Sequence, residues 1–262
     1  MNEPIFIHSD VGKSISSIKS LGFKVDTKNL QQSIYDFLIS FAKKDASRLI
    51  FPAFNYNYGN TQEFKVLEDE IEVGSLPTWV YKTQKFNRTA IPFYSVLSIN
   101  ELGIESDNLI NPFGEQSFFQ KLFEKDGKIF FLGAPFRSNT FIHFVEEMVN
   151  NGPIYRYKKR FDGKIIFGNI KKNVLFEMHV RPKNTFLDYD WDRLERELIE
   201  NNLLKKYKGL DQLKLIKARE LFFYWKKQIE NDPFYLLNDF SKEYMFKATD
   251  KGTKRLELED FE

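Results

Sequence analysis

A histidine and a glutamate three residues apart are the pair in this sequence best suited to proton transfer. His143 and Glu146 lie in residues 140–146, just beyond the apolar run 129–133. Histidine exchanges protons near neutral pH, and a carboxylate one helical turn away can fix its tautomer and orientation. The spacing indicates an acid–base site, although it fits a structural histidine at a helix end equally well.

The composition narrows the class of protein. The 262 residues are 42% hydrophobic and 29% charged, carry a net charge of +2 and include no cysteine. Disulfides, thiolate zinc sites and cysteine nucleophiles are therefore excluded. The balanced charge gives no basic face for nucleic acid, and no apolar run is long enough to span a membrane. We expect no metal site from three scattered histidines, and a cytoplasmic location because residues 1–4 do not resemble a signal peptide.

Short apolar runs that end at turn-forming residues predict buried strands, and segments with helical periodicity alternate with them. The expected strands are 4–8, 48–52, 128–132, 164–167 and 173–180; the expected helices are 31–42, one opening at 74–77, 118–123, 190–204 and 213–230. This order predicts an α/β fold, namely a three-layer α/β/α domain with a central mixed sheet. We expect a single domain over residues 1–245 and a charged C-terminal tail over 246–262.

Seven short segments add a family resemblance to this outline. They are residues 8–10, 51–54, 73–77, 88–95, 112–117, 126–133 and 140–146. In this order and at these spacings the series resembles the aminoglycoside 3-N-acetyltransferase family, from about residue 5 to about residue 240. The resemblance implies that family's α/β fold and an N-acetyltransferase that uses acetyl-coenzyme A.

The resemblance also implies roles for particular residues. His143 matches the family's conserved histidine and would act as the general base that takes a proton from the attacking amine. Transfer would be direct, within a ternary complex, which agrees with the absence of cysteine. Two carboxylates are candidates to orient the histidine. Glu146 is one turn away, and Glu177 is an acidic residue in the otherwise apolar segment 175–178, where the family places an acid.

The cofactor would be held by turns rich in backbone amides and by one arginine. Such turns at helix starts suit anions and amides, and arginine suits phosphate. The candidates are His8, Ser9, Asp10, Gly74, Ser75, Arg88 and Ser95.

Two departures from the family pattern bear on the acceptor. Ile91 stands where the family carries a histidine, and the basic run 156–160 follows the His143 segment where a polycation site would need carboxylates. A basic mouth suits a phosphate-bearing acceptor. We therefore expect a nucleotide-linked amino sugar of surface polysaccharide synthesis. The alternatives are an aminoglycoside acceptor, as in antibiotic resistance, or a non-catalytic binding protein. The abundant aromatic residues make a homodimer possible.

Overall fold

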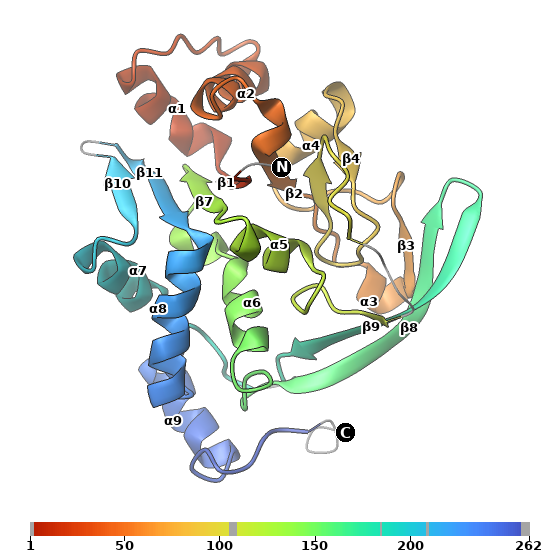
Figure 1. The fold of residues 1–262 in the computed structure, drawn as a ribbon, viewed down its shortest axis with the longest axis vertical. Helices are drawn as coiled ribbons and strands as arrows, with labels where there is room; N and C mark the ends of the chain where they lie inside the picture. Colours follow the sequence, from red (N-terminus) through yellow and green to blue (C-terminus); the bar gives the residue numbers. More distant parts are fainter. Residues whose placement is uncertain (1–2, 105–108, 184, 208–209, 258–262) are drawn as a thin grey trace.

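A mixed sheet forms the centre of the fold (Figure 1). The structure, a computed structural model, describes residues 3–104, 109–183, 185–207 and 210–257. The sheet order is β10-β11-β7-β1-β2-β5-β4. Strand β1 pairs in parallel with β2 and β7, and the outer pairings are antiparallel. The strands are β1 (Ile5–Ser9), β2 (Leu49–Pro52), β4 (Asn87–Arg88), β5 (Val96–Ser98), β7 (Lys128–Leu132), β10 (Lys205–Tyr207) and β11 (Leu210–Lys217).

Helices cover both faces of this sheet because its inner strands are apolar on both faces. In β1, Phe6 packs in one hydrophobic cluster while Ile5 and Ile7 pack in the other. The cluster around Ile5 includes residues of α1 (Val11–Ser20), α2 (Leu30–Phe41) and α4 (Ser75–Thr83). The cluster around Phe6 includes residues of α5 (Phe118–Glu124), α6 (Phe141–Met148), α7 (Trp191–Glu200) and α8 (Ala218–Asn231). The predicted three-layer α/β/α architecture with a mixed sheet is thus confirmed.

A long hairpin extends from this body and forms a second sheet (Figure 1). Its strands β8 (Tyr157–Phe167) and β9 (Ile170–Val180) pair antiparallel over their whole length. β3 (Glu63–Lys65) lies beside β8, β6 (Leu109–Ile110) lies beside β9, and α3 (Tyr58–Thr61) precedes β3. Both strands were predicted, but they begin or end several residues beyond the predicted bounds.

One predicted element is wrong at its start. The expected helix over 213–230 begins only at Ala218, because residues 210–217 form β11, paired antiparallel with β7. Leu213 and Leu215 pack on one face of the sheet and Ile216 on the other, which is the alternation of a strand. Pairing with β7 therefore determines the structure of residues 210–217, although their leucines also fit a helical pattern.

The C-terminal part packs on the segment that follows α6. Helix α9 (Asp239–Ala248) spans the expected boundary at residue 245. Leu256 is buried and its amide donates to the carbonyl of Ile154, while the Arg255 guanidinium binds the carbonyl of Gly152. The division into one domain and a tail stays a prediction. No helix in the described ranges is long and apolar enough to cross a membrane.

Candidate active site

A cavity of about 430 Å³ opens at the carboxyl ends of the central parallel strands. His8 and Ser9 line it from the end of β1, Pro52 from the end of β2, and residues 134 and 137–140 from the segment after β7. In the sheet, β1 lies between β7 and β2, and the chain that leaves β1 next enters this sheet at β2. This is a topological switch point, where α/β sheets bind their ligands.

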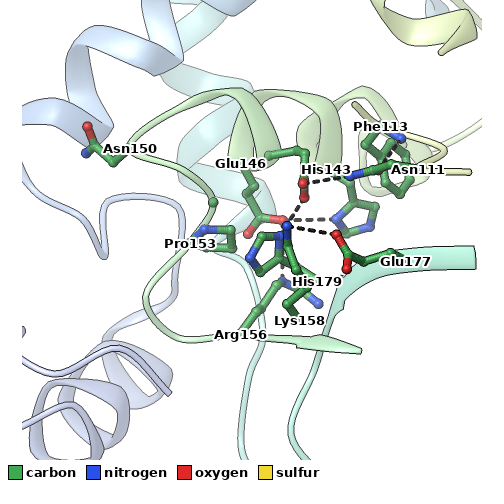
Figure 2. A network of polar contacts seen from close by, with 12 residues as sticks. Asn111, Phe113, His143, Glu146, Asn150, Pro153, Arg156, Lys158, Glu177 and His179 are labelled. Atoms are coloured by element: carbon green, nitrogen blue, oxygen red, sulfur yellow. Dashed lines mark hydrogen bonds and ion pairs between the residues drawn. The ribbon is translucent and has the colours of Figure 1, made fainter. Parts of the chain in front are cut away.

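His143 faces this cavity from the first turn of α6. Its Nδ1 lies 3.0 Å from a carboxylate oxygen of Glu146 (Figure 2). Because a carboxylate only accepts hydrogen bonds, Nδ1 carries the proton and donates it, which leaves Nε2 as the acceptor. Phe113 packs against the imidazole, with 5.3 Å between ring centroids. The ring is thus held in one tautomer with a basic nitrogen available at the cavity.

Glu146 is buried, with 3% of its surface exposed, and its carboxylate is nevertheless well partnered. The hydroxyls of Tyr155 and Tyr189 each donate to it at 2.7 Å. Nε of Arg156 lies 3.4 Å away, an ion-pair contact rather than an aligned hydrogen bond. Burial alone raises the pKa of Glu146, but Arg156, then His143 and Tyr155, outweigh it and lower the pKa to about 2. The carboxylate is therefore ionised at neutral pH.

Glu177, the rival orienting carboxylate, has other partners. One oxygen forms an ion pair with Lys158 at 2.9 Å (Figure 2). The other forms an ion pair with Arg160 at 2.7 Å, also across the hairpin. Among the described residues, Glu146 is the carboxylate in contact with His143. The structure thus brings Glu146, and not Glu177, to the histidine.

The same contacts change the interpretation of the basic run 156–160. Arg156 is buried against Glu146, and Lys158 and Arg160 pair with Glu177. Lys159 lies over the ring of Phe161. Three of the four cations are thus compensated by carboxylates within the chain.

A second histidine–carboxylate pair, which sequence reasoning missed, lies beside the first. Nδ1 of His179 on β9 lies 2.6 Å from Glu147, and the Asn111 amide donates to the other oxygen of Glu147 at 2.8 Å. His179 is mostly buried against Gly152, where a Cβ would come within 2.2 Å of the ring. This pair joins the hairpin to α6 and to the turn after it.

The expected cofactor residues divide into two groups. His8, Ser9 and Gly74 line the cavity, whereas Asp10 caps α1 through the Lys13 amide and Ser75 begins α4 outside the lining. Arg88 and Ser95 are buried and bind each other at 3.0 Å. Both also donate to the carbonyl of Ala53. These two side chains hold the loop after β2 in place, and most of their hydrogen-bond donors are used within the protein.

Ile91, which replaces the family histidine, is a core residue. It is buried with Phe93 and Phe176 and lines a small hollow beside the hairpin. An apolar side chain suits this packing.

Two buried polar side chains at the cavity have side-chain atoms without a hydrogen-bond partner among the described residues. They are Nε2 of His8 and both amide atoms of Asn139. Burial lowers the pKa of His8 to about 3, so its ring is neutral. Unsatisfied buried polar atoms are costly unless a ligand or water meets them. A carboxamide and a neutral imidazole match the amide groups of a pantetheine arm, so the residues present fit coenzyme A.

The residues that complete the site come from distant parts of the chain. Tyr155, Tyr189, Asn139 and Trp191 were not expected there. Asn139 directly precedes the segment 140–146, so the sequence could have indicated it as a site residue. The two tyrosines carry no local signal, because their hydroxyls meet Glu146 only through the fold.

Comparison with known proteins identifies the family. The sequence profile described as aminoglycoside 3-N-acetyltransferase matches residues 38–230. No curated protein matches the chain. The fold resembles AAC-IIIb in a binary complex with CoASH, with a TM-score of 0.68 and 16% identity over 88% of this chain and 90% of that chain. It also resembles the AAC(3)-IVa apoenzyme (TM-score 0.65, 18% identity, 97% and 92%) and YokD from Bacillus subtilis (0.61, 13%, 88% and 88%).

The profile match covers most of the chain, including the His143 segment and helices α5, α6 and α7. It confirms the acyltransferase class, with acetyl-coenzyme A as co-substrate, that the sequence predicted. The chain therefore belongs to the aminoglycoside 3-N-acetyltransferase family and is an N-acetyltransferase.

Proposed function

We propose that this protein transfers an acetyl group from acetyl-coenzyme A directly to the amine of an amino sugar. His143 is the general base and Glu146 orients it. The observation that carries this proposal is the contact of His143 Nδ1 with Glu146 at the wall of the cavity, since it leaves Nε2 as a proton acceptor. Activity of the purified protein with acetyl-coenzyme A and a panel of amino sugars is the direct test.

The proton transfer follows from this geometry. A protonated sugar amine has no lone pair for attack, so the base must remove a proton before or during acetyl transfer. Nε2 takes that proton while the Nδ1 hydrogen stays on the ring and is donated to Glu146, whose carboxylate stabilises the imidazolium that forms. Acetyl-coenzyme A would supply the activated acetyl thioester: the amine nitrogen would bond to the acetyl carbonyl carbon as the C–S bond breaks, and the coenzyme A thiolate would leave and take up a proton. Direct transfer agrees with a chain that has no cysteine to carry an acyl group.

The co-substrate would lie along the cavity between β1 and the segment after β7. His8 and Asn139 would pair with its amides, and Ser9 and Gly74 would line its path. Asp10, Ser75, Arg88 and Ser95 would support this wall from behind. Asp10 and Ser75 do so at the starts of α1 and α4.

The acceptor is an amino sugar of one of two kinds. A nucleotide-linked amino sugar for surface polysaccharide synthesis would need free cations, but most of the basic run is paired internally. A hollow that shares Tyr56 with the cavity is lined by Glu68, Asp69, Glu70 and Glu72. These carboxylates favour an acceptor with several amines. A solved structure of similar fold, AAC(3)-IVa, has been determined in complex with apramycin.

A competition experiment separates the two acceptors. With acetyl-coenzyme A fixed, we expect kcat/KM for a polyamine aminoglycoside to exceed that for a nucleotide-linked amino sugar at least about tenfold, the scale of one favourable charge contact. The preference should shrink as salt is added, because exposed charges are screened. A salt-independent preference for the nucleotide-linked sugar would instead restore the polysaccharide role.

Neutralising each rival carboxylate tests which one orients the base. Glu146→Gln should lower kcat about 10²-fold, since misplacing a catalytic group by about 1 Å has that effect. Glu177→Gln is the matched control and should change kcat less than about threefold, because Glu177 pairs with Lys158 and Arg160 and does not orient the base. Larger loss in the Glu177 variant would reverse the assignment.

Two broader expectations stay proposals. They are a cytoplasmic location and a homodimer. The alternative of a non-catalytic binding protein is set aside, because the chain belongs to a family of N-acetyltransferases.

A further inference from the structure

Arg156 is a buried cation that the proton transfer described above does not use. It is 9% exposed, it is not among the residues that line the cavity, and its Nε lies 3.4 Å from the carboxylate of Glu146 (Figure 2). Its Nη2 donates to the hydroxyl of Tyr189 at 2.7 Å, and that hydroxyl donates in turn to Glu146. Arginine keeps its charge at every working pH. A permanent positive charge is therefore fixed next to the carboxylate that holds the base.

The charge balance of this cluster decides which form of His143 is favoured. With Arg156 positive and Glu146 negative, the buried group is neutral when the imidazole is neutral. If Arg156 were absent, the balanced state would instead pair Glu146 with a protonated imidazole. A low-dielectric site favours the balanced state. Arg156 therefore disfavours protonation of His143, which would prevent the imidazole from accepting a proton from the amine.

We propose that Arg156 is a positioning residue that acts through Glu146 to keep the His143 ring unprotonated and ready to accept a proton. This inference rests on the proposed function, in which His143 is the base. The sequence placed Arg156 in a basic mouth that would bind the acceptor, whereas the structure buries it against Glu146.

The other ionisable groups around the pair leave this balance intact. They are Tyr94 from the segment before β5, Tyr155 after α6, Tyr189 before α7, and, one residue along α6, Glu147 with its partners His179 and Lys158. Burial raises the pKa of each of these tyrosines, so they stay neutral. Glu147 is engaged by His179 and Asn111. Arg156 is therefore the fixed cation in direct contact with Glu146.

The test is the pH profile of kcat/KM in charge variants. Arg156→Met should move the acidic limb to higher pH by about one to three units, the effect of removing an adjacent charge, with activity recovering in alkaline buffer. Arg156→Lys keeps the charge and should leave the limb within about half a unit of wild type. Glu146→Gln keeps the cation but removes the anion, so its limb should move in the opposite direction. The double variant should fall between the two single ones.

A second measurement covers variants with little activity. The chain has three histidines, so the ring nitrogen signals of His143 can be followed by NMR during a pH titration and assigned with His143→Ala. The protonation midpoint should rise in Arg156→Met and fall in Glu146→Gln. If Arg156→Met does not fold, Arg156→Gln takes its place, because it keeps hydrogen-bond donors beside Tyr189 and Glu146 but not the charge, and its midpoint should rise likewise.

Two outcomes would overturn different statements. A uniform loss of activity in Arg156→Met, with the acidic limb and the NMR midpoint unchanged, would reduce Arg156 to a structural role and leave the base intact. Undiminished turnover in His143→Ala would instead remove the base itself, and with it the proposed function.

Discussion

Replacing His143 with alanine is expected to lower kcat by about 10²–10⁴-fold, the usual contribution of a general base. The fold should persist, because the imidazole is partly exposed at the cavity and packs mainly against Phe113. The residual rate should climb with pH, since more of the amine is then already deprotonated. Steady-state kinetics across pH, with thermal unfolding to check the fold, measures both effects.

His143→Gln is the matched control for the loss of the ring's bulk. It retains a polar side chain at the cavity but no base, so it should be as inactive as the alanine variant. The KM for acetyl-coenzyme A should stay within about threefold of wild type in both, because the proton acceptor adds little to ground-state binding. Near-normal turnover in either variant contradicts the assignment.

The fold could be predicted from the sequence wherever the signal was local. Strand β1 shows a fully apolar run, and the alternate packing of Ile5, Phe6 and Ile7 follows from the two-residue period of a strand. Strand β11 was mistaken for helix because its leucines also fit a helical stripe. Only the presence of β7 beside it, about 80 residues away along the chain, decides between the two.

In the candidate site, too, the residues with a local signal could be predicted and those that meet through the fold could not. His143 and Glu146 were recognised because their contact spans one helical turn and needs no other element. Tyr155, Arg156 and Tyr189 reach Glu146 from other segments, so their role depends on packing. A run of cations usually indicates a solvated loop, and no local feature marks Arg156 as buried.

The place of Glu177 was closer to being predictable. Gly168 lies between the two predicted strands, and a two-residue turn there puts Arg160 directly opposite Glu177. Cross-strand neighbours of opposite charge attract, so the register alone favours that ion pair over one with His143. The predicted strands were too short to extend this register to Arg160.

Gly133→Ala is expected to be among the most destabilising single methyl additions in this protein. Gly133 follows β7 with φ of +75°, and a Cβ there would lie 2.3 Å from the carbonyl oxygen of Asp10 and 2.9 Å from the amide of Ser14. Both contacts are backbone atoms at the start of α1, which cannot move without shifting His8 and the cavity wall. The left-handed conformation costs about 1–2 kcal/mol and overpacking about 1–3 kcal/mol.

Gly168→Ala separates these two contributions. Gly168 is also left-handed, with φ of +57°, but a Cβ at this hairpin turn meets nothing within 4 Å. The Gly168→Ala variant should lose about 1–2 kcal/mol in the free energy of unfolding, which is the cost of the left-handed conformation alone. Urea denaturation of both variants therefore gives the cost of the close approach between β7 and α1 as a difference. Equal losses would mean that α1 yields to the added methyl, and acetyl-coenzyme A binding should then weaken in Gly133→Ala alone.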